Sequence, residues 1–219
     1  MRRIVSLLRM PPSNPHAGQP VLRMGPQPAD ARLSVILLHG RGASGDDMLS
    51  LARELRTTDV AYLAPQAAAN TWYPLSFLAP LDRNEPWLTS ALGVIEGLIA
   101  ALETQGIPAE RVAMLGFSQG ACLTLEFAAR HARRYAAIVG LSGGLIGPPG
   151  TPRYYEGAFA STPVFLGCSD VDQHIPLERV HESADVFRHM GADVDKRIYR
   201  GMGHTVNAEE ILAVQGLLA

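Results

Sequence analysis

The sequence predicts an α/β fold, built on a mostly parallel, twisted β-sheet with helices on both faces. Short runs of aliphatic and β-branched residues alternate with longer segments in which apolar residues recur every three or four positions. The predicted strands lie at 34–38, 61–63, 112–115, 137–141, 164–166 and 194–199. The predicted helices lie at 46–56, 88–102, 119–131, 176–190 and 207–218. Because the strands are continuously apolar and alternate with helices, we expect a parallel sheet that is covered on both faces.

The N-terminal part of the chain is expected to form an edge of the fold. Residues 1–32 contain six prolines and two short apolar pieces, at 4–8 and 21–24, and so predict a peripheral hairpin and loop. From residue 33 onward the alternating pattern begins. The long helix over 88–102 has one apolar stripe, and the helix over 176–190 begins at Pro176, a favoured first helical residue. Both stripes are typical of helices that pack on a core.

Length and composition predict one domain over residues 1–219, without a separate lid domain. The chain has 219 residues, of which 47% are apolar and 18% charged, so it can bury a core and is not disordered. The predicted strands, helices and hairpin use nearly the whole chain. We therefore expect the rim of any site to consist of loops and to leave it open and shallow.

Charge and cysteine content exclude several classes of function. The net charge is −2, and the basic residues are scattered, which argues against nucleic acid or anionic membranes as partners. Cys122 and Cys168 lie in apolar runs without metal-ligand spacing, so we expect buried thiols and no metal or other cofactor. The first ten residues resemble neither a secretory signal nor a membrane anchor, which favours a cytoplasmic protein.

The strand at 112–115 runs into the sequence GFSQG, with Ser118 at its centre, and a helix follows. A serine in a sharp strand-to-helix turn, with glycines two positions away on each side, is the pattern of a nucleophile elbow. The glycines leave room for the turn, and the helix directs its positive N-terminal end toward the site. We therefore predict that Ser118 is a nucleophile.

A serine nucleophile needs a base and an orienting carboxylate, and both follow later strands. His204 lies on a glycine-flanked loop after the last strand, and His174 is the alternative base. Asp170 and Asp172 both follow the strand at 164–166, and spacing does not separate them. The chain order Ser, Asp, His is the order found in α/β-hydrolases.

Five motifs together resemble the phospholipase/carboxylesterase family of α/β-hydrolases, which includes the acyl-protein thioesterases. They are HGRG at 39–42, GFSQG at 116–120, LSGG at 141–144, DVD at 170–172 with Ile175-Pro176, and GMGH at 201–204. The resemblance implies the α/β-hydrolase fold over about residues 33–218 and selects Asp172 as the catalytic carboxylate. The sequence departs from the family at Cys168-Ser169, where a His-Gly pair is usual.

The same layout predicts an oxyanion hole and a substrate pocket. One donor should be the backbone N–H of Gln119, directly after the nucleophile, and the other the backbone N–H of Arg41, because the loop resembles the family's H-G-x-G. The Arg41 side chain is expected either to face solvent or to meet a substrate carboxylate. The resemblance implies a pocket role for Trp72, and Gly42 is predicted to contact substrate as well.

These residues predict a serine carboxylesterase acting on small or short-to-medium acyl-chain esters through a Ser118-His204-Asp172 triad. The nearest alternative is a thioesterase for acylated proteins or small thioesters, because the same triad attacks both carbonyl types. A second alternative is a ligand-binding sensor that keeps the hydrolase pocket without efficient turnover. The expected partner is a small-molecule ester, with no nucleic acid and no stable membrane insertion, and the chain is expected to be a monomer or homodimer.

Overall fold

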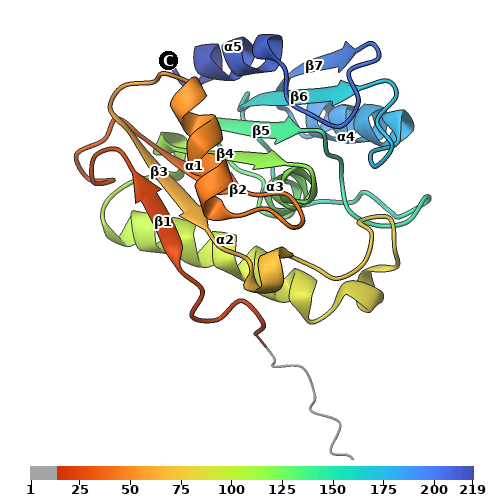
Figure 1. The fold of residues 1–219 in the computed structure, drawn as a ribbon, viewed down its shortest axis with the longest axis horizontal. Coiled ribbons are helices and arrows are strands. Elements are labelled where there is room, and N and C mark those ends of the chain that lie inside the picture. Colours follow the sequence, from red (N-terminus) through yellow and green to blue (C-terminus); the bar gives the residue numbers. More distant parts are fainter. Residues whose placement is uncertain (1–13) are drawn as a thin grey trace, which may run out of the picture.

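The computed structural model describes residues 14–219, which form a seven-stranded sheet flanked by five α-helices (Figure 1). The strands are β1 (Val21–Met24), β2 (Leu33–Leu38), β3 (Val60–Pro65), β4 (Val112–Phe117), β5 (Ala137–Leu141), β6 (Pro163–Ser169) and β7 (Asp193–Tyr199). The α-helices are α1 (Gly45–Glu54), α2 (Trp87–Thr104), α3 (Gln119–Arg130), α4 (Leu177–His189) and α5 (Ala208–Leu217). Three 3₁₀ turns are η1 (Ala68–Asn70), η2 (Leu81–Asn84) and η3 (Ala109–Arg111).

The strand order is β1-β3-β2-β4-β5-β6-β7, and all neighbouring pairs are parallel except the antiparallel pair of β1 with β3. The prediction of a mostly parallel α/β sheet is therefore confirmed. The 21–24 half of the predicted hairpin forms β1, at one edge of the sheet. The 4–8 half lies outside the described residues.

Helices cover both faces of the sheet, and each face has its own apolar core (Figure 1). Helices α2, α3 and α4 pack on one face, and α1 and α5 pack on the other. In β2, Ile36 and Leu38 point into the first core, whereas Val35 and Leu37 point into the second. Because side chains alternate between two buried faces, the central strands have no solvent-facing side and appear in the sequence as largely apolar runs.

Several strands extend further than the apolar runs predict, and β3 and β6 extend furthest. The run at 61–63 belongs to β3 (Val60–Pro65), and the run at 164–166 belongs to β6, which continues to Ser169. The ladder with β7 holds through the pair Ser169 and Tyr199, although glycine, cysteine and serine interrupt the aliphatic pattern. Backbone pairing between strands therefore carries β6 to within three residues of Asp172.

Helix α2 is, among the described residues, the one helix whose length and composition would suffice to cross a membrane. One face of it lies in the core, through side chains that include Leu88, Ile95 and Leu102. Packing on the sheet therefore accounts for its apolar character.

Candidate active site

Ser118 occupies a strained turn between β4 and α3. Its backbone has φ 55° and ψ −119°, a conformation that residues other than glycine rarely adopt. The turn is held by the Ser118 N–H, which donates to Leu141 O at 2.9 Å, and by the Cys122 N–H, which donates to Ser118 O at 3.0 Å. The strained turn directs the hydroxyl away from the sheet at the start of α3, as the GFSQG pattern predicts.

The elbow requires glycine at 116 and 120 because backbone passes too close for a side chain. A Cβ added at Gly116 would lie 2.2 Å from Gly120 O, and one added at Gly120 would lie 2.0 Å from Leu38 O. These approaches bring the end of β2, the end of β4 and the start of α3 together. The backbone at the start of α3 is therefore packed directly against the ends of β2 and β4.

Replacing Gly120 with alanine is expected to lower the free energy of unfolding by about 3 kcal/mol, because the backbone must move to admit the methyl group. Gly97→Ala is the matched control: Gly97 lies within α2, and an added Cβ meets nothing within 4 Å. That substitution is expected to raise the free energy of unfolding by about 0.5–1 kcal/mol. Urea denaturation measures both, and equal effects at the two positions would contradict the packing account.

The structure brings Ser118, His204 and Asp172 into one hydrogen-bonded chain. Nε2 of His204 lies 2.8 Å from the Ser118 hydroxyl, and Nδ1 of His204 lies 2.7 Å from Oδ2 of Asp172. The Asp172 side chain is fully buried, whereas the His204 side chain is 19% exposed. The three side chains come from the ends of β4, β6 and β7, which meet at the carboxyl edge of the parallel sheet.

The Asp172 carboxylate accepts hydrogen bonds from backbone N–H groups as well as from His204. Its Oδ1 accepts from the backbone N–H groups of His174 at 2.8 Å and Ile175 at 3.1 Å. Burial by itself would raise the pKa of Asp172, but the hydrogen bonds from His204 and the two amides outweigh burial and lower it. The carboxylate is therefore ionised at neutral pH and can stabilise a positive charge on the imidazole.

Asp170 and Asp172 have different partners, which resolves the alternative that spacing left open. Oδ1 of Asp170 accepts from the Gly201 N–H at 2.8 Å and lies on the exposed side of the loop. Asp170 therefore fastens the loop that carries His204, whereas Asp172 contacts the His204 ring itself.

Neither His174 nor His181 is hydrogen-bonded to the Ser118 hydroxyl. His174 packs edge-on against His204, with ring centroids 4.8 Å apart, and Phe117 packs on His204 at 5.1 Å. Nδ1 of His181 lies 2.6 Å from Nζ of Lys196. The two aromatic contacts restrict the orientation of the His204 ring, so that both nitrogens keep their partners.

Cys168 and Ser169, where the sequence departs from the family pattern, both support this arrangement. Ser169 Oγ accepts from the N–H groups of Val171 and Gly203, each at 3.1 Å, and so joins the Asp172 loop to the His204 loop. The Cys168 thiol points at Oδ2 of Asp172 at 3.8 Å, and burial raises its pKa to about 12, which keeps it a neutral donor. The sequence marked Ser169 through its departure from the family pattern, directly before the two acids, but did not reveal this linking role.

Two backbone N–H groups beside Ser118 have no acceptor among the described residues. They belong to Arg41 and Gln119, the pair predicted to form an oxyanion hole. The loop of Arg41 is fixed by His39, which is buried, donates from Nδ1 to Gly40 O at 2.7 Å and accepts from Ala67 N–H at 3.1 Å. Burial lowers the pKa of His39, so the ring is neutral and serves as a structural link.

A cavity of about 640 Å³ opens onto Ser118. Its wall contains Tyr73, Leu75, Phe77 and Phe117, together with the polar groups of Arg41 and His174. Trp72 is fully buried behind this wall, and its Nε1–H donates to His39 O at 2.9 Å. Trp72, for which a pocket role was predicted, is thus not among the residues that line the cavity, whereas its neighbour Tyr73 is; the Trp72 indole contacts the loop at 39–42.

Gly42 lies outside the residues that line the cavity, although Arg41 and Ala43 on either side line it. It has a positive φ of 78°, and its N–H donates to Asn70 O at 2.7 Å. The positive φ allows the loop to turn so that the preceding residue, Arg41, faces the cavity. Gly42 therefore shapes the loop. The predicted substrate contact of Gly42 is not supported by the cavity, because Gly42 is not among the lining residues.

The side chain of Gln119 fastens the cavity wall to the elbow, a role that the sequence did not reveal. Its Oε1 accepts from the Trp72 N–H at 2.9 Å, and its Nε2 donates to Tyr73 O at 2.8 Å. Gln119 is buried, so these bonds are shielded from water. The residue after the nucleophile therefore places the loop that forms one side of the pocket.

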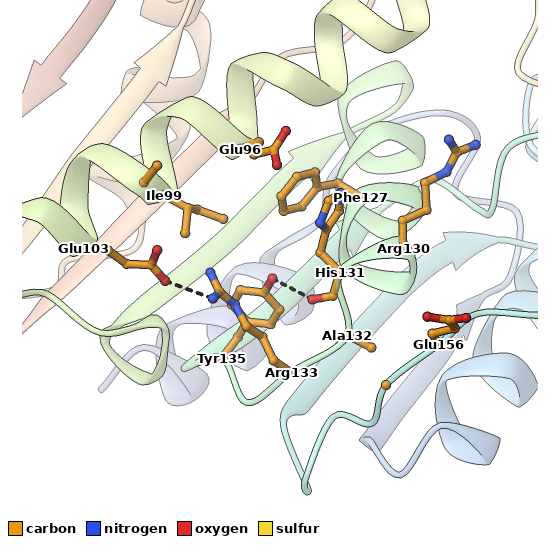
Figure 2. Close-up of a pocket in the computed structure, with 12 residues that line it drawn as sticks. Glu96, Ile99, Glu103, Phe127, Arg130, His131, Ala132, Arg133, Tyr135 and Glu156 are labelled. Atoms are coloured by element: carbon orange, nitrogen blue, oxygen red, sulfur yellow. Dashed lines mark hydrogen bonds and ion pairs between the residues drawn. The ribbon is translucent and has the colours of Figure 1, made fainter.

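A second cavity, of about 470 Å³, lies between α2 and the C-terminal end of α3 (Figure 2). Both of its arginines are paired: Arg133 with Glu103, on the same wall, at 2.9 Å, and Arg130 with Glu126, outside the lining, at 2.7 Å. The Tyr135 hydroxyl donates to His131 O at 2.8 Å (Figure 2). No serine or cysteine lines this cavity, so we assign the chemistry to the cavity at Ser118.

Comparisons with known proteins agree with the fold and with the motifs. The family model described as Phospholipase/Carboxylesterase matches residues 25–219. The acyl-protein thioesterase 1 of Yarrowia lipolytica is 28% identical over 211 residues, which cover 88% of this chain and 92% of that protein. The corresponding protein of Saccharomyces cerevisiae is 26% identical over 212 residues, which cover 87% of this chain and 93% of that protein.

Solved structures give the same result. A phospholipase/carboxylesterase from Dyadobacter fermentans is 42% identical, superposes with a TM-score of 0.88, and covers 92% of this chain and 97% of its own. The Bacillus cereus carboxylesterase, 14% identical with a TM-score of 0.72, covers 92% of this chain and 94% of its own and shares the fold. The chain therefore belongs to the phospholipase/carboxylesterase family, an α/β-hydrolase family of enzymes.

Proposed function

We propose that the protein is a serine carboxylesterase that hydrolyses small or short-to-medium acyl-chain esters through an acyl-enzyme. The observation that carries the proposal is the chain of hydrogen bonds from Ser118 through His204 to Asp172, at 2.8 and 2.7 Å, on the wall of an open cavity. Distances of this length allow direct proton transfer between the hydroxyl and the imidazole. Family membership supports hydrolysis as the reaction class.

In the acylation step, Ser118 Oγ attacks the ester carbonyl while His204 Nε2 takes the hydroxyl proton. The imidazole becomes cationic, and the ionised Asp172 stabilises that charge through Nδ1–H. His204 then gives the proton to the oxygen of the leaving alcohol as the carbonyl–oxygen bond breaks. Water repeats the sequence on the acyl-enzyme: His204 takes its proton, the acid is released, and Ser118 regains its hydrogen.

The negative charge on the tetrahedral intermediate is assigned to the backbone N–H groups of Arg41 and Gln119. Both are without an acceptor among the described residues, and Gln119 begins α3, so the positive end of the helix dipole adds to the stabilisation. Preformed donors of this kind are worth about 3–4 kcal/mol each in the transition state. No cofactor takes part in these steps.

The size of the cavity supports short and medium acyl chains. About 640 Å³ accommodates a small ester, and its apolar wall of Tyr73, Leu75, Phe77 and Phe117 suits an acyl chain of a few carbons. The described residues contain no lid domain that would enclose a long chain. Long acyl groups would therefore leave apolar surface exposed to water.

A thioesterase activity is the second candidate, and the names of the relatives favour it. Curated relatives from Yarrowia lipolytica and Saccharomyces cerevisiae are acyl-protein thioesterases, at 28% and 26% identity. A thioester carbonyl can be attacked by the same serine and stabilised by the same two amides. An acylated protein would have to present its acyl group to the open mouth of the cavity.

A panel of 4-nitrophenyl esters and matched acyl thioesters, from two to sixteen acyl carbons, tests both candidates. We expect kcat/KM to be highest between two and about eight carbons and to fall at sixteen by at least about tenfold, because the longer chain exceeds the pocket. A maximum at sixteen carbons, or thioesters preferred at every length, would favour the thioesterase. The Dyadobacter fermentans relative provides a control of the same fold.

A further inference from the structure

The side chain of Arg41 is fixed at the mouth of the cavity by uncharged partners. Nη1 donates to Thr71 Oγ1 at 3.0 Å and to Pro74 O at 2.9 Å, and Nη2 donates to Leu75 O at 2.6 Å. A guanidinium has five N–H donors, so two remain without acceptors among the described residues, on the neighbouring nitrogens Nε and Nη2. The positive charge is therefore held in place without being neutralised.

Within the part of the chain that the structure describes, no carboxylate on the cavity wall neutralises this guanidinium. Among the described residues, no aspartate or glutamate lines the cavity, and its titratable wall groups besides Arg41 are His174, His204, Tyr73 and Cys122. Asp172 is buried on the far side of His204 and bonded to His204 and two amides. The mouth of the site therefore has a positive potential that no wall carboxylate cancels.

An anion binds to a fixed cation at a lower entropic cost than to a mobile one, because the entropy of ordering the side chain has already been lost. Arginine binds carboxylates and phosphates by hydrogen bonds from neighbouring nitrogens, which are stronger than bonds between neutral groups. Ser118 and Arg41 line the same cavity, so a substrate held at the serine has the guanidinium within the same space.

We propose that this site selects esters that carry a negatively charged group, and that the Arg41 guanidinium recognises that group. The inference rests on the proposed esterase function and names its substrate class. The group recognised is a carboxylate of the ester substrate itself, on either the acyl or the alcohol side.

Two matched pairs of probes test the selection. The alcohol-side pair is 4-(butanoyloxy)benzoate and its methyl ester, and the acyl-side pair is the mono-4-nitrophenyl ester of adipic acid and its methyl ester, each corrected for spontaneous hydrolysis. The measured quantity is the ratio of kcat/KM for the charged probe to that for the neutral probe. The wild type is expected to give a ratio of at least about ten at low salt for one pair, and added salt is expected to reduce it.

Variants separate the charge from the loop contacts that Arg41 also makes. Arg41→Gln is expected to bring the ratio to about one, whereas Arg41→Lys keeps part of it. Arg134→Gln is the matched control, because Arg134 is also exposed and donates to a backbone carbonyl, Ala160 O at 2.7 Å, but lies away from the cavity. That variant changes the net charge equally and should leave the ratio unchanged.

A wild-type ratio of one or less for both pairs would overturn the inference, as would a high ratio that survives in Arg41→Gln. Serine-dependent hydrolysis of the neutral probes, seen alongside either result, would show that the esterase function stands and only the selection fails. If no probe is hydrolysed in a Ser118-dependent manner, the proposed function fails as well.

Discussion

Replacing Ser118 with alanine is expected to lower kcat for a short-chain 4-nitrophenyl ester by about 10⁴–10⁶-fold while the protein stays folded. The hydroxyl is the only serine oxygen that lies within hydrogen-bond distance of His204 in the described part of the chain. Without it no acyl-enzyme can form, and the remaining rate reflects binding and the two oxyanion donors. Steady-state kinetics measure the loss, and circular dichroism checks the fold.

Ser142→Ala is the matched control for this experiment. Ser142 follows β5 as Ser118 follows β4, and both have a positive φ, 52° for Ser142 and 55° for Ser118. The Ser142 hydroxyl is buried and, within residues 14–219, lacks a hydrogen-bond partner. Its removal is expected to leave kcat within a few-fold of the wild type, so near-normal turnover by Ser118→Ala would contradict the assignment.

Asp172→Asn is expected to lower kcat by about 10⁴-fold, nearly as much as the loss of the serine. The amide is neutral, so it cannot stabilise the imidazolium. If its NH₂ group faces Nδ1 of His204, it also favours the tautomer with the proton on Nε2, and that nitrogen can no longer accept from Ser118. The measurement is kcat as a function of pH, with the fold checked separately.

Asp170→Asn is the companion variant, two residues away. Asp170 accepts from the Gly201 N–H at 2.8 Å, and the carbonyl oxygen of asparagine can accept the same bond. We expect a loss of less than about tenfold, through a looser His204 loop. If Asp170→Asn were the inactive variant and Asp172→Asn the active one, the two carboxylates would have to exchange roles.

Much of the fold could be predicted because strands and helices differ in local pattern. The apolar runs in β2 and β5 mark strands buried on both faces, and the stripe in α2 marks a helix buried on one. The extension of β6 to Ser169 could not be predicted in this way, because pairing with β7 holds residues that are not themselves apolar. The antiparallel pairing of β1 with β3 depends likewise on a partner distant in the sequence.

The candidate site could be predicted as far as motifs and chain order determine it. Ser118 and His204 follow from the strand-turn-helix pattern and from the glycine-flanked loop, and the structure brings them to 2.8 Å. Spacing alone did not distinguish Asp170 from Asp172, because the difference lies in the direction each side chain takes from one short loop. The family resemblance selected Asp172, the carboxylate that contacts His204.

Contacts between loops distant in the sequence could not be predicted. The Gln119 side chain meets the backbone of Trp72 and Tyr73, 47 and 46 residues away, and Ser169 meets Gly203 across 34 residues. A tryptophan in a strand-end loop looks like a pocket wall in the sequence, but the loop turns so that Trp72 packs inward and Tyr73 faces the cavity. Loop conformation, rather than residue type, decides which of two neighbouring aromatics lines the cavity.

We propose that Ser118, activated by His204, is the nucleophile of an esterase. A fluorophosphonate probe tests it directly: the folded wild type is incubated with the probe, digested, and the modified peptide is identified by mass spectrometry. We predict one adduct, on Ser118, that does not form after denaturation or in the His204→Ala variant, because the hydroxyl needs the folded base to react. Absence of labelling, an adduct on another residue, or equal labelling of the denatured chain would contradict the claim.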